Sequence, residues 1–151
     1  MIGSRTLTAP KIIIATGGHS ILPTIDGVAG VGALDSKSML ELKTLPESLI
    51  FIGAGYIGAE LAQMMSRMGV KVTVVARSHL LPGAEPEVSE ALADAFMAEG
   101  ITLLTGLSYE NVRRDAAGVT LRVMQRSPRI ILSPPLADAP IPKEWAWKRS
   151  A

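Results

Sequence analysis

An α/β fold built on a parallel sheet, with an added antiparallel hairpin, is the fold class that this 151-residue sequence predicts. Three observations predict it. Residues 48–77 show a strand–helix–strand pattern with the length of a βαβ crossover. A second helix and strand are predicted within residues 86–104. Two strand-like segments within residues 109–123 flank a turn sequence, which indicates a hairpin.

The first predicted element is a strand. Lys11–Thr16 is a short apolar run rich in β-branched residues, and such runs are typical of buried strands. Two glycines end it. Proline and glycine are scattered through residues 19–47, so we expect a connection across a surface with one short helical turn near Lys37–Leu42.

The βαβ unit follows. Leu49–Ile52 is its first strand, a helix begins near Gly55 and ends at Gly69, and Lys71–Ala76 is its second strand. Apolar residues recur along the helix at steps of three and four, which indicates one buried face. That predicted face consists of Ile57, Leu61, Met64 or Met65, and Met68.

The second helix is expected to begin at Pro86 and to end before Gly100, with the strand Ile101–Leu104 after it. Its predicted buried face is Val88, Leu92 and Phe96. The hairpin then joins Tyr109–Arg114 to Val119–Val123. Apolar and polar residues alternate in the second arm, as in a half-buried antiparallel strand.

Composition excludes several classes of function. Hydrophobic residues make up 48% and charged residues 19%, with a net charge of +1, which argues against a nucleic-acid or anionic-membrane binder. Cysteine is absent and there are only two histidines, so thiol chemistry and Cys- or His-rich metal sites are not expected. No apolar run reaches the ~18–20 residues of a membrane span, and the first residues lack a signal-peptide core. We therefore expect a cytoplasmic protein.

Gly53-Ala54-Gly55-Tyr56-Ile57-Gly58 matches the pattern GxGxxG directly after a predicted strand and at the start of a helix. In a Rossmann-like unit Gly53 permits the tight turn, Gly55 lets a pyrophosphate approach the backbone, and Gly58 lets the helix pack close to the strand. The amides at the helix start then hold the phosphates. We therefore predict dinucleotide binding; the alternative is a glycine-rich turn without a ligand.

The end of the second strand bears on the choice of dinucleotide. NAD sites usually carry Asp or Glu there, but this strand ends Val75-Ala76-Arg77-Ser78-His79. Arg77 could pair with the 2′-phosphate of NADP through two charge-assisted hydrogen bonds. NADP is therefore favoured over NAD. The alternatives are a solvated Arg77 and an exposed His79 without a role.

Three segments together resemble the pyridine nucleotide-disulfide oxidoreductases, a family that includes mercuric reductase, dihydrolipoyl dehydrogenase and glutathione reductase. They are TAPKIIIATGG, LPESLIFIGAGYIGAELAQMMSRMGVKVTVV and PEVSEALADAFMAEGITLL. The resemblance runs from Thr8 to Met124. It implies that Ala15, Thr16 and Gly17 form the ATG motif beside FAD, and that the second segment opens the NAD(P) domain.

The resemblance also implies roles within the glycine segment. Tyr56 matches the aromatic that gates the nicotinamide pocket, and Glu60 matches the glutamate near the carboxamide and the flavin edge. Ile57 belongs with them among the expected cofactor-binding residues. From the residues alone, Tyr56 is a packing aromatic and Glu60 stabilises the helix dipole. Gly83 stands where glutathione reductase carries a second arginine.

The resemblance implies that residues 1–47 are a remnant of the FAD domain with a connection, and that residues 48–124 are an incomplete NAD(P)-binding domain. The expected function is that of the central segment, truncated at both ends, of an FAD-dependent oxidoreductase. The complete enzyme passes hydride from NADPH to flavin and electrons to a disulfide, dithiol or metal ion. A homodimer is expected only for that enzyme, and this chain alone is expected to be inactive. A stand-alone dinucleotide-binding module and a non-functional gene product are the alternatives.

Residues 125–151 depart from the family pattern, and we hypothesise that they are translated out of frame. Shifting the reading frame by one base turns Trp145–Ala146 into glycine and Trp147–Lys148 into glutamate. The remaining codons permit a segment like the family's GRxPN and TEGLGLE motifs. The alternative is a divergent tail. The nucleotide sequence of these codons decides between the two.

Overall fold

A computed structural model describes residues 3–125 of the chain. Its centre is a parallel sheet in the order β1-β2-β3, with an antiparallel pair β4-β5 beside it. The predicted α/β fold class is therefore confirmed. The strands are β1 (Ser48–Ile52), β2 (Lys71–Val75), β3 (Thr102–Leu104), β4 (Leu107–Asp115) and β5 (Gly118–Gln125). The helices are a 3-10 turn η1 (Val28–Gly30), α1 (Ser36–Leu40), α2 (Tyr56–Arg67) and α3 (Pro86–Ala98).

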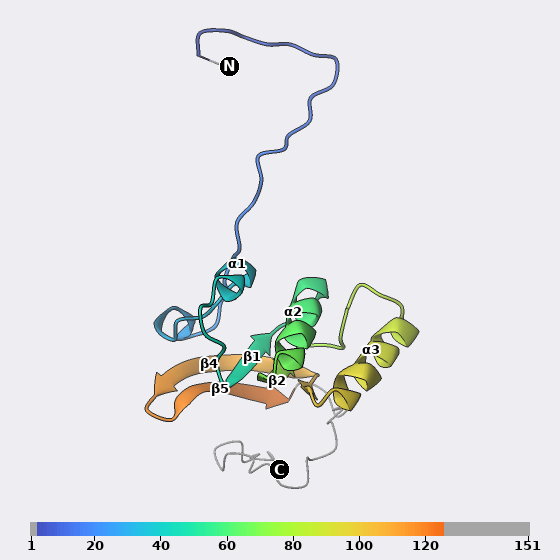
Figure 1. Ribbon diagram of the computed structural model, residues 1–151. Helices are drawn as coiled ribbons and strands as arrows, with labels where there is room; N and C mark the ends of the chain where they lie inside the picture. Colours follow the sequence, from blue (N-terminus) through green and yellow to red (C-terminus); the bar gives the residue numbers. More distant parts are fainter. Residues whose placement is uncertain (1–2, 126–151) are drawn as a thin grey trace.

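The molecule has three layers (Figure 1). Helices α2 and α3 lie on one face of the parallel sheet, and the β4-β5 hairpin lies on the other. Alternation along β2 divides the core between the two faces. Val72 and Val74 pack with the helices, whereas Val75 packs with Leu107 and Leu121 of the hairpin. β2 is therefore covered on both faces and paired on both edges.

The predicted buried faces of both long helices are wrong in part. Ile57 of α2 is 64% exposed and Met68, just after α2, is 45% exposed. The residues that α2 buries are Ala59, Ala62 and Met65, with Leu61 and Met64 partly buried beside them. Two of the three buried residues are small alanines, which let the helix pack close to the sheet. On α3 the buried set is Ser89, Ala93 and Phe96, while Val88 is half exposed.

The predicted strand Lys11–Thr16 does not form. Ile12, Ile13 and Ile14 are 76%, 90% and 84% exposed, and the segment runs away from the sheet in an extended conformation (Figure 1). A strand requires a neighbour to satisfy its backbone amides and carbonyls. No strand within residues 3–125 pairs with this segment.

The connection before β1 does more than cross a surface. Ile25 and Val31 are buried in the hairpin-side core. The Val112 amide donates to the Asp26 carbonyl at 2.8 Å, and both Arg114 nitrogens Nε and Nη2 donate to the Val31 carbonyl. The expected helical turn is α1, whose N-terminus is closed by reciprocal hydrogen bonds between Asp35 and Ser38.

The division of the chain into 1–47, 48–124 and 125–151 stays a prediction. Only Gln125 of the last range belongs to the described residues, so the out-of-frame tail lies outside them. No helix in the described part has the length and apolar character needed to cross a bilayer.

Candidate functional site

The glycine segment lies at the edge of the sheet where the parallel strands end. Gly53 follows β1 with a φ of 102°, a left-handed conformation that favours glycine. Its amide donates to the Val75 carbonyl at 2.8 Å, which ties the end of β1 to the end of β2. A Cβ on Gly58 would lie 3.2 Å from the Gly53 carbonyl oxygen. The segment therefore makes the tight turn and the close helix–strand approach that its pattern predicts.

Gly55 is the N-cap residue of α2 and leaves open space at the helix start. No side chain caps this helix. Apart from its chain neighbours, no atom lies within 4 Å of the place a Gly55 side chain would take. The first amides of a helix have no partner within the helix and carry its positive dipole. The helix start is therefore open to a ligand, as phosphate binding at a helix N-terminus requires.

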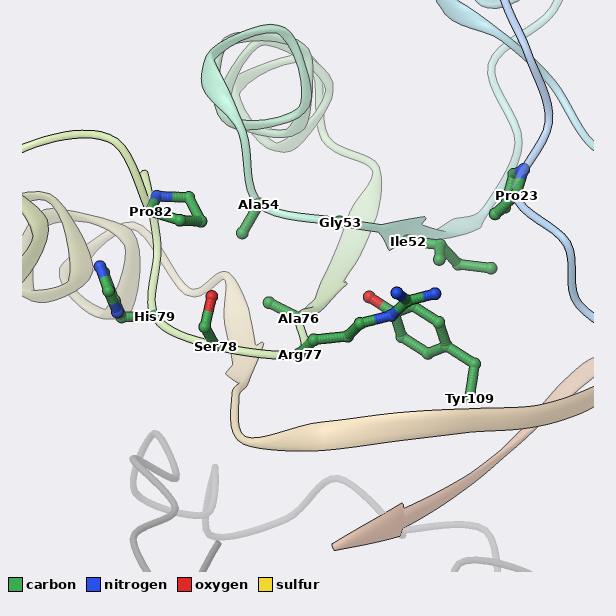
Figure 2. A pocket seen from close by; sticks show the side chains of 10 residues that line it. All are labelled: Pro23, Ile52, Gly53, Ala54, Ala76, Arg77, Ser78, His79, Pro82 and Tyr109. Carbon is green, nitrogen blue, oxygen red and sulfur yellow. The ribbon is translucent and has the colours of Figure 1, made fainter. Parts of the chain in front are cut away.

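A pocket of about 280 Å³ opens beside this segment (Figure 2). It combines the ends of β1 and β2, the loop after β2, and the start of β4. None of its ten lining residues is acidic. They are Pro23, Ile52, Gly53, Ala54, Ala76, Arg77, Ser78, His79, Pro82 and Tyr109.

Arg77 and Tyr109 form one wall of the pocket. The guanidinium carbon of Arg77 lies 5.2 Å from the centre of the Tyr109 ring, which is a cation–π contact. The Tyr109 hydroxyl donates to the Val75 carbonyl at 3.0 Å. Burial raises the pKa of Tyr109, while the charge of Arg77 and a hydrogen bond with the Gly53 backbone act in the opposite direction. Tyr109 therefore stays a neutral donor at neutral pH.

The loop after β2 is fastened to the glycine segment. The Leu81 amide donates to the Ala54 carbonyl at 2.7 Å, and Leu80 is fully buried. Leu81 has a φ of 49°, an uncommon conformation for a residue with a side chain. The Leu81 carbonyl accepts from Ser89 Oγ at 3.4 Å. These contacts hold the loop that carries Arg77 beside the glycine turn.

Tyr56 and Glu60 line a second, smaller pocket of about 150 Å³. They are one helical turn apart at the start of α2, so they share a face. Tyr56 is 59% exposed and stands at the surface. Gln63, Leu81 and Phe96 are among the other lining residues. The glycine segment lies between the two pockets, since Ala54 lines the first and Tyr56 the second.

The other predicted site residues lie outside both pockets. Ala15, Thr16 and Gly17 lie in the exposed N-terminal segment and line neither pocket. Ile57 is exposed on the first turn of α2 and lines neither pocket. No cluster of three or more His, Cys, Asp or Glu side chains suited to a metal ion lies within residues 3–125.

Sequence reasoning missed Tyr109 as a pocket residue. It assigned Tyr109 only to the first arm of the hairpin. The signal available was its position: an aromatic soon after the third parallel strand, where the chain leaves the edge at which ligands bind in such sheets. Pro23 gave no signal, because only the fold brings the connection to this pocket.

Comparison with known proteins identifies the family. The family model of pyridine nucleotide-disulphide oxidoreductases matches residues 3–132. Mercuric reductase of Bacillus cereus is 44% identical over 115 residues, which cover 76% of this chain and 18% of that protein. Dihydrolipoyl dehydrogenase of Chlorobaculum tepidum is 38% identical over 122 residues, covering 80% and 26%.

Solved structures of flavoprotein reductases and related oxidases resemble this fold. A Cu(II) complex of the HOCl-induced flavoprotein disulfide reductase from Escherichia coli matches with a TM-score of 0.66 at 27% identity, covering 78% of this chain and 27% of that one. An engineered water-forming NADPH oxidase bound to NADPH matches with a TM-score of 0.59 at 26% identity, covering 68% and 25%. The chain thus spans between 18% and 27% of the length of these relatives. It belongs to the pyridine nucleotide-disulphide oxidoreductases, a family of FAD-dependent oxidoreductases.

Proposed function

We propose that this chain binds NADP(H) as the dinucleotide-binding segment of an FAD-dependent oxidoreductase. The complete enzyme would transfer hydride from NADPH to flavin and pass electrons to a disulfide, a dithiol or a metal ion. One observation carries the proposal: the Gly53 turn and Arg77 open onto the same pocket, whose lining contains no carboxylate. The mercuric reductase relatives support the reductase part of the proposal, and the structural relative bound to NADPH supports binding of a nicotinamide dinucleotide.

Each part of the dinucleotide has residues suited to hold it. The amides at the start of α2, including that of Ile57, donate to the pyrophosphate in the open space beside Gly55. Arg77 pairs with the 2′-phosphate, because its planar fork of donors matches phosphate oxygens. A carboxylate in this pocket would repel that phosphate, and none lines it. NAD is the alternative, since the pyrophosphate contacts are common to both cofactors.

The second pocket suits the nicotinamide end. When bound there, the nicotinamide supplies the hydride. Tyr56 covers the ring with its exposed aromatic side chain, and the Glu60 carboxylate accepts a hydrogen bond from the carboxamide. These two roles come from the family resemblance. The shared face of Tyr56 and Glu60 on α2 is what supports them in this chain.

The remaining electron transfer is assigned to the complete enzyme. These 151 residues contain no cysteine, so they cannot themselves supply a redox disulfide. Ala15, Thr16 and Gly17 are exposed and line neither of the two pockets described above. We therefore assign FAD, the terminal acceptor and a homodimer only to a complete enzyme, and expect the 151-residue chain to bind the dinucleotide without reducing disulfides.

Calorimetric titration of the 151-residue chain with NADPH and with NADH tests the proposal. A charge-assisted phosphate contact predicts that NADPH binds roughly tenfold to a hundredfold more tightly. Arg77→Glu should abolish that preference, because it replaces the donor with a repelling carboxylate. Lys71→Glu is the matched control. It makes the same change of net charge at an exposed residue at the opposite end of β2.

The two variants separate local recognition from general electrostatics. If Lys71→Glu lowers the preference as much as Arg77→Glu, the effect belongs to net charge rather than to a site at Arg77. If the wild-type chain binds NADH as tightly as NADPH, the assignment to NADP is wrong. If neither nucleotide binds, dinucleotide binding itself is wrong.

A further inference from the structure

The stacked pair of Arg77 and Tyr109 joins two parts of the chain that are distant in sequence. Arg77 follows β2, whereas Tyr109 lies on β4 (Figure 2). Their separation of 5.2 Å places the guanidinium over the aromatic face. Both side chains line the pocket beside the glycine turn. The hairpin therefore supplies one surface of a site whose other residues come from the ends of β1 and β2, the loop after β2, and Pro23 of the connection.

Tyr109 is itself held firmly. Its hydroxyl donates to the Val75 carbonyl, and the Gly53 amide donates to the same carbonyl. Its ring packs against the hairpin-side core, which includes Leu107 and Leu121. The ring is thus tied to the ends of β1 and β2, and its position relative to the glycine turn is set by short hydrogen bonds.

Arg77, by contrast, is exposed and forms no ion pair with a carboxylate within residues 3–125. A free arginine side chain has many rotamers, and fixing it on a ligand opposes binding. Stacking on Tyr109 restricts those rotamers before a ligand arrives. The contact with the ring uses the charge of the guanidinium and none of its hydrogen bonds, so the N–H donors stay available to two phosphate oxygens.

We infer that Tyr109 is a positioning residue that preorganises Arg77 for recognition of a nucleotide's 2′-phosphate. This inference rests on the proposed function and adds a specificity determinant from the hairpin. Tyr109 does not touch the phosphate. Its ring acts through Arg77, so its removal should weaken binding of the 2′-phosphate and leave the rest of the nucleotide unaffected.

Two probes isolate that phosphate. Adenosine 2′,5′-bisphosphate and adenosine 5′-monophosphate differ only in the 2′-phosphate, and the ratio of their calorimetric affinities for the 151-residue chain is the readout. Tyr109→Leu removes the aromatic face and should lower this ratio about fivefold to tenfold, by the loss of one preorganised side chain. Tyr109→Phe keeps the face and should hold the ratio within about twofold.

Stability needs its own control, because Tyr109 also packs against the core. Leu121→Ala loosens the same core without touching Arg77, and its ratio should equal that of the wild type. Tyr109→Met is a second variant without an aromatic face, whose flexible side chain fills the space if Tyr109→Leu fails to fold. Circular dichroism verifies that each variant is folded.

The outcomes are distinct. An unchanged ratio in the folded Leu and Met variants overturns the inference, as does an equal fall in Tyr109→Phe, which would place the effect in the hydroxyl. An equal fall in Leu121→Ala would mean that stability alone sets the ratio. A wild-type chain that binds the two probes equally would refute NADP recognition itself, which is the failure of the proposed function rather than of the role of Tyr109.

Discussion

Two β-branched segments of similar composition have opposite fates in this chain. Lys71–Val75 forms β2, the central strand, and its three valines are buried. Lys11–Thr16 forms no strand, and its three isoleucines are exposed. The difference lies in their surroundings. β2 has a parallel partner on each edge and a packed layer on each face, whereas no strand within residues 3–125 pairs with the other segment.

The comparison shows that a β-branched segment forms a strand where neighbouring strands and packed layers are present. The strand propensity of its residues reflects this packing more than an intrinsic backbone preference. An isolated apolar segment gains nothing from extension, because its amides and carbonyls stay bonded to water. The same holds within the N-terminal region. Ile25 and Val31 come from an irregular connection, yet they are buried because the hairpin lies against them.

The largest expected effect comes from placing one charge in each segment. Val74→Asp buries an unpaired carboxylate between the sheet and the helices, and should lower the free energy of unfolding by about 4 kcal/mol. Ile13→Asp places the same charge in solvent, and should change it by about 0.5 kcal/mol or less. Urea denaturation followed by circular dichroism measures both. Equal losses would show that residues 11–16 pack into the fold.

A smaller effect is expected at two glycines with positive φ. Gly17 lies in the exposed N-terminal segment, and Gly27 lies in the connection beside the hairpin. A Cβ on Gly27 would overlap the Val112 carbonyl oxygen, so Gly27→Ala must push the connection off the hairpin. The expected loss in unfolding free energy is about 2 kcal/mol. Gly17 has a positive φ but open space around it, and its exposed segment can move to a conformation that alanine adopts, so Gly17→Ala should cost about 0.5 kcal/mol or less.

Thermal unfolding of the two glycine variants is the measurement. If Gly17→Ala lowers the transition temperature as far as Gly27→Ala, the exposed segment is held in its conformation by contacts that the fold described above does not contain.

The smallest effect concerns pH. Arg67 of α2 donates from Nε to Glu99 Oε2 at 2.9 Å, and this hydrogen bonding lowers the pKa of Glu99. A carboxyl whose pKa is lower in the folded state stabilises the fold at neutral pH. That stabilisation is lost as pH falls through the folded-state pKa. Acidification from about pH 6 to about pH 3 should therefore destabilise wild type more than Glu99→Gln.

Urea denaturation at the two pH values measures this difference. Glu110→Gln, at an exposed residue of β4, controls for the loss of one charge. A wild-type chain and a Glu99→Gln variant with the same acid sensitivity would show that the Arg67 contact adds nothing to stability, as is common for exposed ion pairs.

Much of the local structure was predictable from sequence. The βαβ unit, the second helix, its strand and the hairpin were each predicted near their observed bounds, because periodicity, proline and glycine mark them. Of the residues that α2 buries, Met65 was predicted but Ala59 and Ala62 were not, since counting large apolar side chains overlooks alanine. A helix that packs close to a sheet buries small residues, and only the distance between the two elements reveals this.

The candidate site also has some features that the sequence predicts and others that depend on the tertiary structure. Sequence by itself determined the glycine turn and the lack of an acid after β2, because adjacent residues and their backbone conformations carry both. Tertiary structure alone decided that Arg77 stacks on Tyr109 and that Pro23 reaches the pocket. It also decided that β2 is buried while Lys11–Thr16 is not. The physical reason is common to all three. Contacts between residues distant in sequence depend on which surfaces the fold brings together. A local pattern indicates that an apolar surface is suited to burial, but it does not indicate which part of the chain packs on it.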